Sequence, residues 1–143
     1  MDVRSALAAI APPAANYAHA VISEHSARWL HTSGVVPIQP DGTVPATIEA
    51  QAEVVWINLL AILREAGMEA HDVVSVTTYV VAEQLPSLAI VMGARDRALA
   101  GHRVASTLVT VPALARPEWK MDCLLYTSPS PRDRTRSRMP SSA

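Results

Sequence analysis

The stretch "TIEAQAEVVWINLLAILREAG" (residues 47–67), followed closely by "DVVSVTTYVVAE" (72–83), sets the architecture of the chain. In the first segment, apolar side chains recur at the three- and four-residue spacing of a helix with one buried face. They are Ala52, Val55, Trp56, Leu59, Leu63 and Ala66. Thr47 suits the N-cap, and Gly67 can end the helix. The second segment is rich in β-branched residues and predicts a buried strand.

The same alternation of helix and strand continues toward the C-terminus. Residues 85–101 predict a second helix, with Pro86 in its first turn and Gly101 at its end. Strands are predicted at 103–111 and 117–126. Upstream, residues 17–25 and 26–38 predict two further strands, which can pair as a hairpin.

The predicted order, ββαβαβ(β), favours an α+β two-layer sandwich. Packing both helices on one face of a single mixed sheet is the most economical way to bury their apolar sides. The other sheet face then carries many apolar residues that need a cover. We therefore expect a homo-oligomer.

Length and composition bound the class of protein. A chain of 143 residues, half of them hydrophobic, predicts one globular domain. Its single cysteine, Cys123, excludes an internal disulfide and fits a reducing, cytoplasmic setting. The longest apolar run, residues 54–63, is too short to cross a bilayer. The N-terminus lacks the apolar core of a signal peptide, so no membrane partner is expected.

Charge is distributed unevenly along the chain. The net charge is −1, but residues 127–143 hold four Arg and one Asp, which leaves −4 on residues 1–126. A mildly acidic body argues against a nucleic-acid partner. Residues 127–143 are mostly Ser, Pro and Arg, and we expect them to be disordered. A basic nucleic-acid-binding tail is the alternative interpretation.

The sequence of the C-terminal segment is also unusual. From residue 124 onward it resembles translated adaptor or vector sequence, which has to be set aside when the fold is considered. We therefore expect a single domain over residues 1–126, with its last strand truncated near Cys123, and a non-native tail over 127–143.

Strong catalytic motifs are missing from the sequence. It contains no dinucleotide fingerprint, no phosphate-binding loop, no nucleophile elbow and no paired-cysteine zinc spacing. Its five histidines, at positions 19, 25, 31, 71 and 102, include no pair at helical i, i+4 spacing. We therefore do not expect a metal ion.

Several segments, taken in order, resemble the RidA/YjgF family of enamine/imine deaminases. They are "NYAHAV" (16–21), "LHTSGVVPI" (30–38), "DGTV" (41–44), "AQAEVVWINLLAILREAGMEAHDVVSVTTYV" (50–80) and "ARDRALAGHRVASTLV" (94–109). The likeness covers roughly residues 12–122. It implies a chorismate-mutase-like (bacillus-type) α+β fold and a homotrimer with ligand clefts between its subunits. It also implies cofactor-free hydrolysis of 2-imino or 2-enamino acids to 2-keto acids and ammonia.

The resemblance carries residue roles with it. The family's tyrosine matches Tyr17, and its acidic residue in the last strand most nearly matches Asp122. These two are the candidate catalytic residues. Gly34, Ser106 and Thr107 fall at family positions that line the substrate site. The acid would orient water at the imine carbon.

The sequence departs from the family's active pattern at one decisive position. Deaminating members place an arginine directly before the serine of the fourth strand, where a guanidinium can grip a small carboxylate. Here that position is Ala105, and Thr107 replaces the thiol that often follows the serine. Arg103 can compensate, because residues i and i+2 of a strand face the same side. Alternatively, Arg103 lies in the loop before the strand and faces water.

Three functional hypotheses remain open on this basis. The chain can be a hydrolase of imino acids, weakened by Ala105. It can be a non-catalytic trimer of the same family that binds a small carboxylate-bearing metabolite. A structural or regulatory trimer without a ligand is the third.

Overall fold

The computed structural model describes residues 15–22 and 27–128. Its main elements are β1 (Leu30–His31), α2 (Ile48–Glu65), β2 (Val73–Val81), α3 (Leu88–Ala98), β3 (Ala105–Val111) and β4 (Met121–Thr127). Short 3-10 helices precede β2 at Ala70–Asp72 and precede α3 at Ala82–Ser87. Of the helices in this part of the chain, none combines the length and apolar character needed to cross a membrane.

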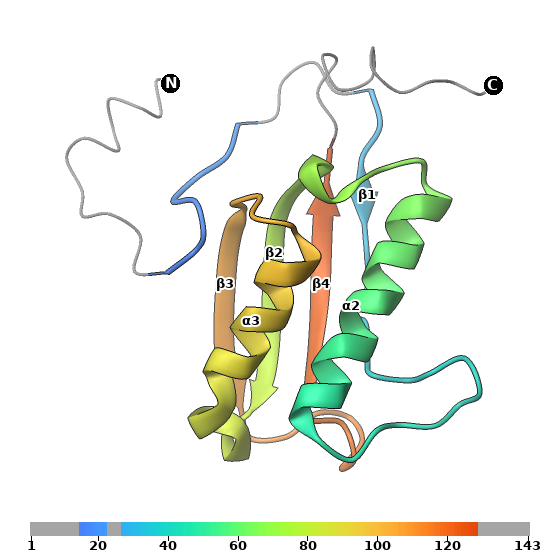
Figure 1. The fold of residues 1–143 in the computed structure, drawn as a ribbon, viewed down its shortest axis with the longest axis vertical. Helices are drawn as coiled ribbons and strands as arrows, with labels where there is room; N and C mark the ends of the chain where they lie inside the picture. The colour runs from blue at the N-terminus through green and yellow to red at the C-terminus, as the bar shows by residue number, and fades with distance from the viewer. Residues whose placement is uncertain (1–14, 23–26, 129–143) are drawn as a thin grey trace.

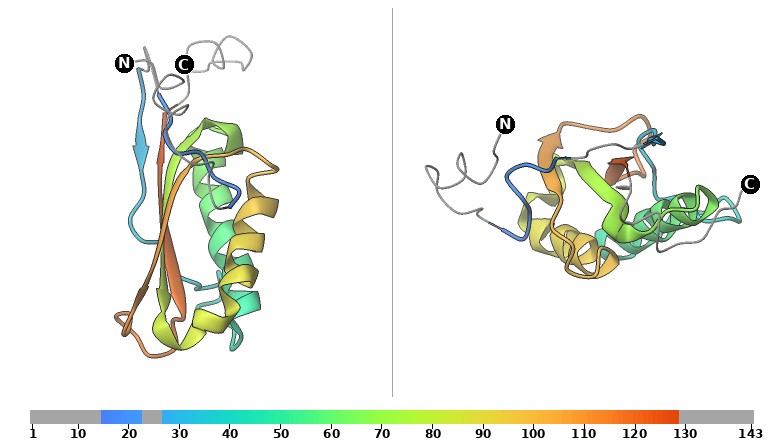
Figure 2. Two further views of the ribbon diagram at one scale, coloured as in Figure 1. Left: turned by 90° about the vertical axis from the view of Figure 1, so that its left-hand side faces the viewer. Right: turned by 90° about the horizontal axis from the view of Figure 1, so that it is seen from above.

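The strands form one mixed sheet in the order β1-β4-β2-β3. β2 and β3 run parallel and are joined through α3, while β4 lies antiparallel to both β2 and β1. Both helices cover the same face of this sheet (Figures 1 and 2). The predicted α+β two-layer sandwich, with two helices on one face of a mixed sheet, is therefore confirmed.

Strict alternation along the two central strands builds the core. In β4, Met121, Cys123 and Leu125 are almost fully buried, whereas the residues between them are half-exposed. Val76 and Val80 of β2 point to the same side and are equally buried. The apolar stripe of α2 packs onto this layer, as its spacing predicts. Thr47 accepts a hydrogen bond from the amide of Ala50, which confirms the predicted cap.

The predicted hairpin is wrong within the described residues. Ala18 forms an isolated parallel bridge with Ala105 at the outer edge of β3. By contrast, Leu30–His31 pairs with β4, at the opposite edge of the sheet. The backbone amides of Thr32 and Val35 also donate to carbonyls of β4. The segment that follows β1 is therefore paired with β4 and not with the Ala18 segment. The expected turn lies partly in residues 23–26, outside the described part.

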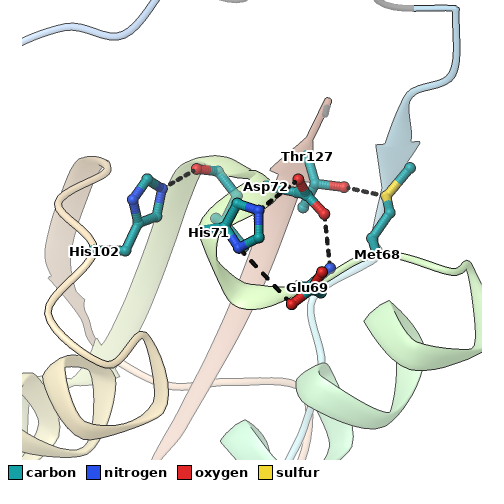
Figure 3. A network of polar contacts seen from close by, with 7 residues as sticks. Met68, Glu69, His71, Asp72, His102 and Thr127 are labelled. Atoms are coloured by element: carbon teal, nitrogen blue, oxygen red, sulfur yellow. Dashed lines mark hydrogen bonds and ion pairs between the residues drawn. The ribbon is translucent and has the colours of Figure 1, made fainter. Parts of the chain in front are cut away.

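β4 continues past Cys123 in this chain. Residues up to Thr127 pair with β2, with a register shift between Val73 and Ser75, and Thr127 is fully buried. Its hydroxyl donates to the sulfur of Met68 over 2.9 Å (Figure 3). The amide of Ser128 donates to the carbonyl of Asp72. The boundary at residue 126 and the truncation of the last strand stay predictions. Residues 129–143 lie outside the described part, and their expected disorder remains a prediction.

A buried glutamine joins the helix layer to two loops. Gln51 is 1% exposed, although helix periodicity alone assigns no polar residue to the core. Its amide nitrogen donates to the carbonyls of Pro45 and Glu118, over 2.7 and 2.9 Å. Its amide oxygen accepts from the backbone N–H of Lys120 over 2.8 Å. One side chain thus satisfies three backbone groups and holds the approach to β4 against α2.

We predict that Gln51→Leu destabilises the protein by about 3 kcal/mol, because it leaves buried backbone groups without partners. Urea unfolding followed by circular dichroism measures the change. Gln84→Leu, on the half-exposed turn before α3, is the control and should shift stability by less than about 0.5 kcal/mol. Equal effects of the two substitutions would show that Gln51 does not link these segments.

Candidate functional site

The sheet face opposite the helices is lined by alternate residues of the three long strands. Strand register places cross-strand partners on the same face. One row across this face holds Val109, Tyr79 and Asp122. A second row, further toward the start of β3, holds Ala105, Ser75, Tyr126 and His31. We call this surface the open face.

Asp122 and Gly34 meet at one side of the open face. A Cβ atom added to Gly34 would lie 3.2 Å from Oδ2 of Asp122, a tight contact that would require the carboxyl group to shift by a few tenths of an ångström. The bridge between Val35 and Cys123 holds the two segments together. The structure therefore brings together two of the residues that the sequence selected, although they are far apart in the chain.

The carboxyl group of Asp122 lies in an environment that disfavours its charge. Burial raises the pKa of Asp122 above its ordinary value. Its Oδ1 atom is buried and has no hydrogen-bond partner among the described residues. A carboxyl group of this kind can hold a water molecule and exchange a proton at a pH closer to neutrality than a solvated aspartate can.

A second group of predicted residues gathers at the start of β3. Ala18 is paired with Ala105 in an isolated bridge. The ring of Tyr17, the residue before Ala18, lies edge-on to the ring of His19, with 6.1 Å between their centroids. Arg103 is exposed, and its guanidinium donates to the carbonyl of Ala15 over 3.4 Å. Arg103 thus lies before the strand, as the alternative interpretation had it, yet remains close to Ala105 and to the Tyr17 segment.

Ser106 and Thr107 point to opposite sides of the sheet. Thr107 is exposed on the open face, where Thr77 and Leu124 are its neighbours across the strands. Ser106 faces the helix layer, and its hydroxyl accepts from Nη1 of Arg95 over 3.2 Å. The side chain of Ser106 is therefore not on the open face, and its expected role as a substrate contact stays a prediction.

The two groups are too far apart to hold one small ligand within a single chain. Ala105 and Asp122 lie on strands separated by β2, which corresponds to roughly 10 Å across the sheet. Through Ser75, Ala105 is level with Tyr126, four residues along β4 from Asp122, which adds roughly 13 Å along the strand. The acid and the start of β3 therefore form two separate half-sites.

Neither the Cys123 thiol nor a cluster of metal-ligating side chains provides a second candidate site in the described residues. Burial raises the pKa of the Cys123 thiol to about 12, so it is not a nucleophile at neutral pH. In the described ranges, no group of three or more His, Cys, Asp or Glu side chains is placed to hold a metal ion.

Arg95 is a buried residue that the sequence-based predictions did not include. It shares the inward stripe of α3 with Val91 and Ala94, and this helical spacing is the signal that could have identified it.

Comparisons with known proteins agree on one family. The family model described as "Endoribonuclease L-PSP" matches residues 8–125. The 2-iminobutanoate/2-iminopropanoate deaminase of Escherichia coli strain K12 is 42% identical over 50 residues. That match covers 34% of this chain and 39% of the deaminase, so it spans under half of the curated relative's length.

Solved structures extend the likeness over most of the fold. A protein of unknown function of the conserved Rid protein family, YyfB from Yersinia pestis, is 31% identical, with a TM-score of 0.73. The alignment covers 79% of this chain and 86% of that one. E. coli TdcF with bound serine is 25% identical, with a TM-score of 0.66 over 85% of this chain and 91% of TdcF.

We predict that Asp122 titrates above the ordinary aspartate value of about 3.9 and that Gly34→Ala raises its pKa further, because the added methyl group displaces water from the carboxyl. Carboxyl carbon chemical shifts measured against pH report both values. Gly93→Ala, in α3, is the control and should leave the Asp122 titration unchanged. An Asp122 pKa at or below the ordinary value would contradict the proposed environment.

Proposed function

This chain belongs to the RidA/YjgF family, the family of the endoribonuclease L-PSP model, and we propose that it hydrolyses 2-imino or 2-enamino acids. The products would be the corresponding 2-keto acids and ammonia. The observation that carries this proposal is the pairing of Asp122 with Gly34 on the open face. It combines a carboxyl group of raised pKa, whose buried Oδ1 has no partner among the described residues, with a glycine whose backbone approaches that group closely.

The reaction needs one group that moves protons. In the proposed mechanism, ionised Asp122 accepts a proton from water while the water oxygen bonds to C2 of the imine. Asp122 passes this proton to the imine nitrogen as the C=N double bond opens, which gives a neutral tetrahedral carbinolamine and an ionised carboxylate again. The carboxylate then takes the hydroxyl proton and delivers it to the amino nitrogen, so that the C=O bond forms, the C–N bond breaks and neutral ammonia leaves. One water is consumed for each imino acid.

The carboxylate of the substrate needs a second, cationic contact. Our candidate is Arg103, two residues before Ala105, whose guanidinium donates to the carbonyl of Ala15 in the segment that carries Tyr17. Because this half-site lies far from Asp122 of the same chain, we propose that the two halves come from neighbouring copies. The bound serine of TdcF, itself a small 2-amino carboxylate, supports this ligand class.

A second copy also meets the need to cover the open face. Val109 is 40% exposed and Trp29 is 63% exposed, and the rings of Trp29 and His31 both contact Tyr126. Apolar and aromatic surface of this kind is typical of an interface. We propose the homotrimer implied by the family, with its ligand clefts between subunits.

Ribonuclease activity, which the name of the family model suggests, is less well supported. Binding an RNA backbone requires clustered positive charge, because neutralised phosphates supply most of the affinity. Residues 1–126 carry a net charge of −4, and the candidate acid lies on the open face. An anionic polymer would be repelled by this charge, whereas a single small carboxylate needs only one guanidinium.

Ala105 favours a second candidate function, a trimer that binds a small metabolite without efficient turnover. Ala105 stands where deaminating members of the family have the arginine that binds the substrate carboxylate. The ligand carboxylate would therefore be bound only by the more distant guanidinium of Arg103. A single charge-assisted contact in place of two parallel ones loses about 1.5–3 kcal/mol. Turnover assays separate the two candidates, because a binding module would retain a 2-keto acid without consuming the imine.

We predict that Asp122→Asn lowers kcat/KM for 2-iminobutanoate about 100-fold or more, because the proton acceptor is lost. At pH 8 the same change should not lower Tm. A carboxyl whose pKa is raised by folding contributes stability only at low pH and loses it as the pH rises through that pKa, so removing the charge costs nothing at pH 8. Asp41→Asn, on an exposed turn, should keep full activity. Full activity in Asp122→Asn would disprove the proposed role.

We also predict that Ala105→Arg raises kcat/KM about tenfold, because it restores a two-bond grip on the carboxylate. Arg103→Ala should abolish most of the remaining activity and weaken binding of 2-oxobutanoate, measured by calorimetry. Arg116→Ala, which removes an exposed guanidinium over Trp119, is the control for a general charge effect. If Arg103→Ala changes neither quantity, Arg103 is not the clamp.

A further inference from the structure

Arg95 is the one Arg or Lys that is buried in the described part of the chain, and it is only 6% exposed. The sequence suggests a charged helix face around "RDR" at 95–97, yet only Arg97 behaves in that way. The Arg97 guanidinium is exposed and pairs with Glu53 of α2. Arg95 instead points between α3 and the sheet, because it shares the inward stripe of the helix with Val91 and Leu99.

The guanidinium of Arg95 is held at two places. Its Nε donates to Oδ1 of Asp96 over 3.0 Å, and its Nη2 lies 2.9 Å from the same oxygen. Its Nη1 donates to the hydroxyl of Ser106 in β3 over 3.2 Å. Burying a cation is unfavourable unless it is paired, and a buried pair often stabilises a fold no better than well-packed apolar residues. A contribution to stability is therefore a poor explanation for this arrangement.

Ser106 connects Arg95 with the candidate site. It lies between Ala105 and Thr107, which both face the open side where the substrate carboxylate is proposed to bind. Among the described residues, β3 is an edge strand whose outer side is paired only at Ala105, and Ser106 and Thr107 are paired there with β2. A contact from the helix layer to Ser106 would help to hold this part of the strand in place.

We propose that Arg95 is a positioning residue for the carboxylate half-site: acting through the Ser106 hydroxyl, it fixes the backbone of β3 from Ala105 to Thr107. This inference rests on the proposed deaminase function. It goes beyond that function by assigning a role to a buried residue that touches no substrate. Small displacements far from the reacting atoms can cost on the order of 100-fold in rate, so such support can matter as much as a direct contact.

The test compares wild type, Arg95→Met, Ser106→Ala and the double variant in steady-state hydrolysis of 2-iminobutanoate. 2-Oxobutanoate serves as the calorimetric probe of ground-state binding. Arg95→Met keeps the length of the side chain and removes the guanidinium, while Ser106→Ala removes only the hydroxyl that accepts from it. Arg97→Met, two residues along the same helix, is the matched control for the loss of a helix arginine. Tm is recorded for every variant.

We expect Arg95→Met and Ser106→Ala each to raise KM and the Kd for 2-oxobutanoate about tenfold, with kcat changed less than about twofold. The double variant should be no worse than the poorer single variant, because both changes break the same contact. Arg97→Met should match wild type. If Arg95→Met fails to fold, Ser106→Ala alone decides, since it leaves the buried pair with Asp96 intact.

Several results would overturn the inference. Wild-type KM and Kd in Ser106→Ala would exclude the route through the hydroxyl, as would fully additive effects in the double variant. A fall in Tm without a change in KM would leave Arg95 a structural residue only. If wild type itself neither hydrolyses the imine nor binds 2-oxobutanoate, the proposed function fails first, and this inference fails with it.

Discussion

The antiparallel pairing of β4 with β2 is the interaction on which the rest of the molecule depends. It inserts the last strand between β1 and β2, and it directs Met121, Cys123 and Leu125 into the core beneath the helices. The same alternation turns Asp122 outward onto the open face, where burial raises the pKa of its carboxyl group. Core and candidate site are thus two sides of one strand, and a shift of register by one residue would exchange them. Gln51 reinforces this by holding Lys120, the residue before β4, against α2.

The strand order separates the two proposed half-sites, the one at Asp122 and the one at Arg103, within a single chain. β2 lies between β4 and β3, so the acid at Asp122 and the cation at Arg103 cannot meet across a single sheet. The open face also leaves Trp29 and Val109 exposed, and a neighbouring copy would cover them. Under the proposed function, oligomerisation would both bury apolar surface and complete the substrate site. The contact between Arg95 and Ser106 would then support that site from the helix layer.

Much of the fold could be predicted from local pattern. The helix at 48–65 and the strand at 73–81 follow from apolar periodicity and β-branched content, and the caps at Thr47 and Gly67 from turn chemistry. The hairpin could not be predicted correctly, because edge pairing depends on which partner strand is available, a tertiary property. The neighbourhood of Gly34 and Asp122 was accessible only through the family resemblance. The inward placement of Ser106 and Arg95 depends on which sheet face and which helix stripe each occupies. For Arg95, the charged residues at 95–97 suggested an exposed helix face instead.

Subunit complementation tests most directly whether the site is built from two copies. Asp122→Asn removes the acid, and Ala105→Asp places a repelling carboxylate in the other half-site. Each variant alone should be inactive toward 2-iminobutanoate. After the two are unfolded together and refolded as an equal mixture, about a quarter of the interfaces in a cyclic oligomer pair two intact halves. We therefore predict that the refolded mixture recovers about a quarter of the wild-type activity. A correctly refolded mixed oligomer without activity would contradict it and place the site within a single chain.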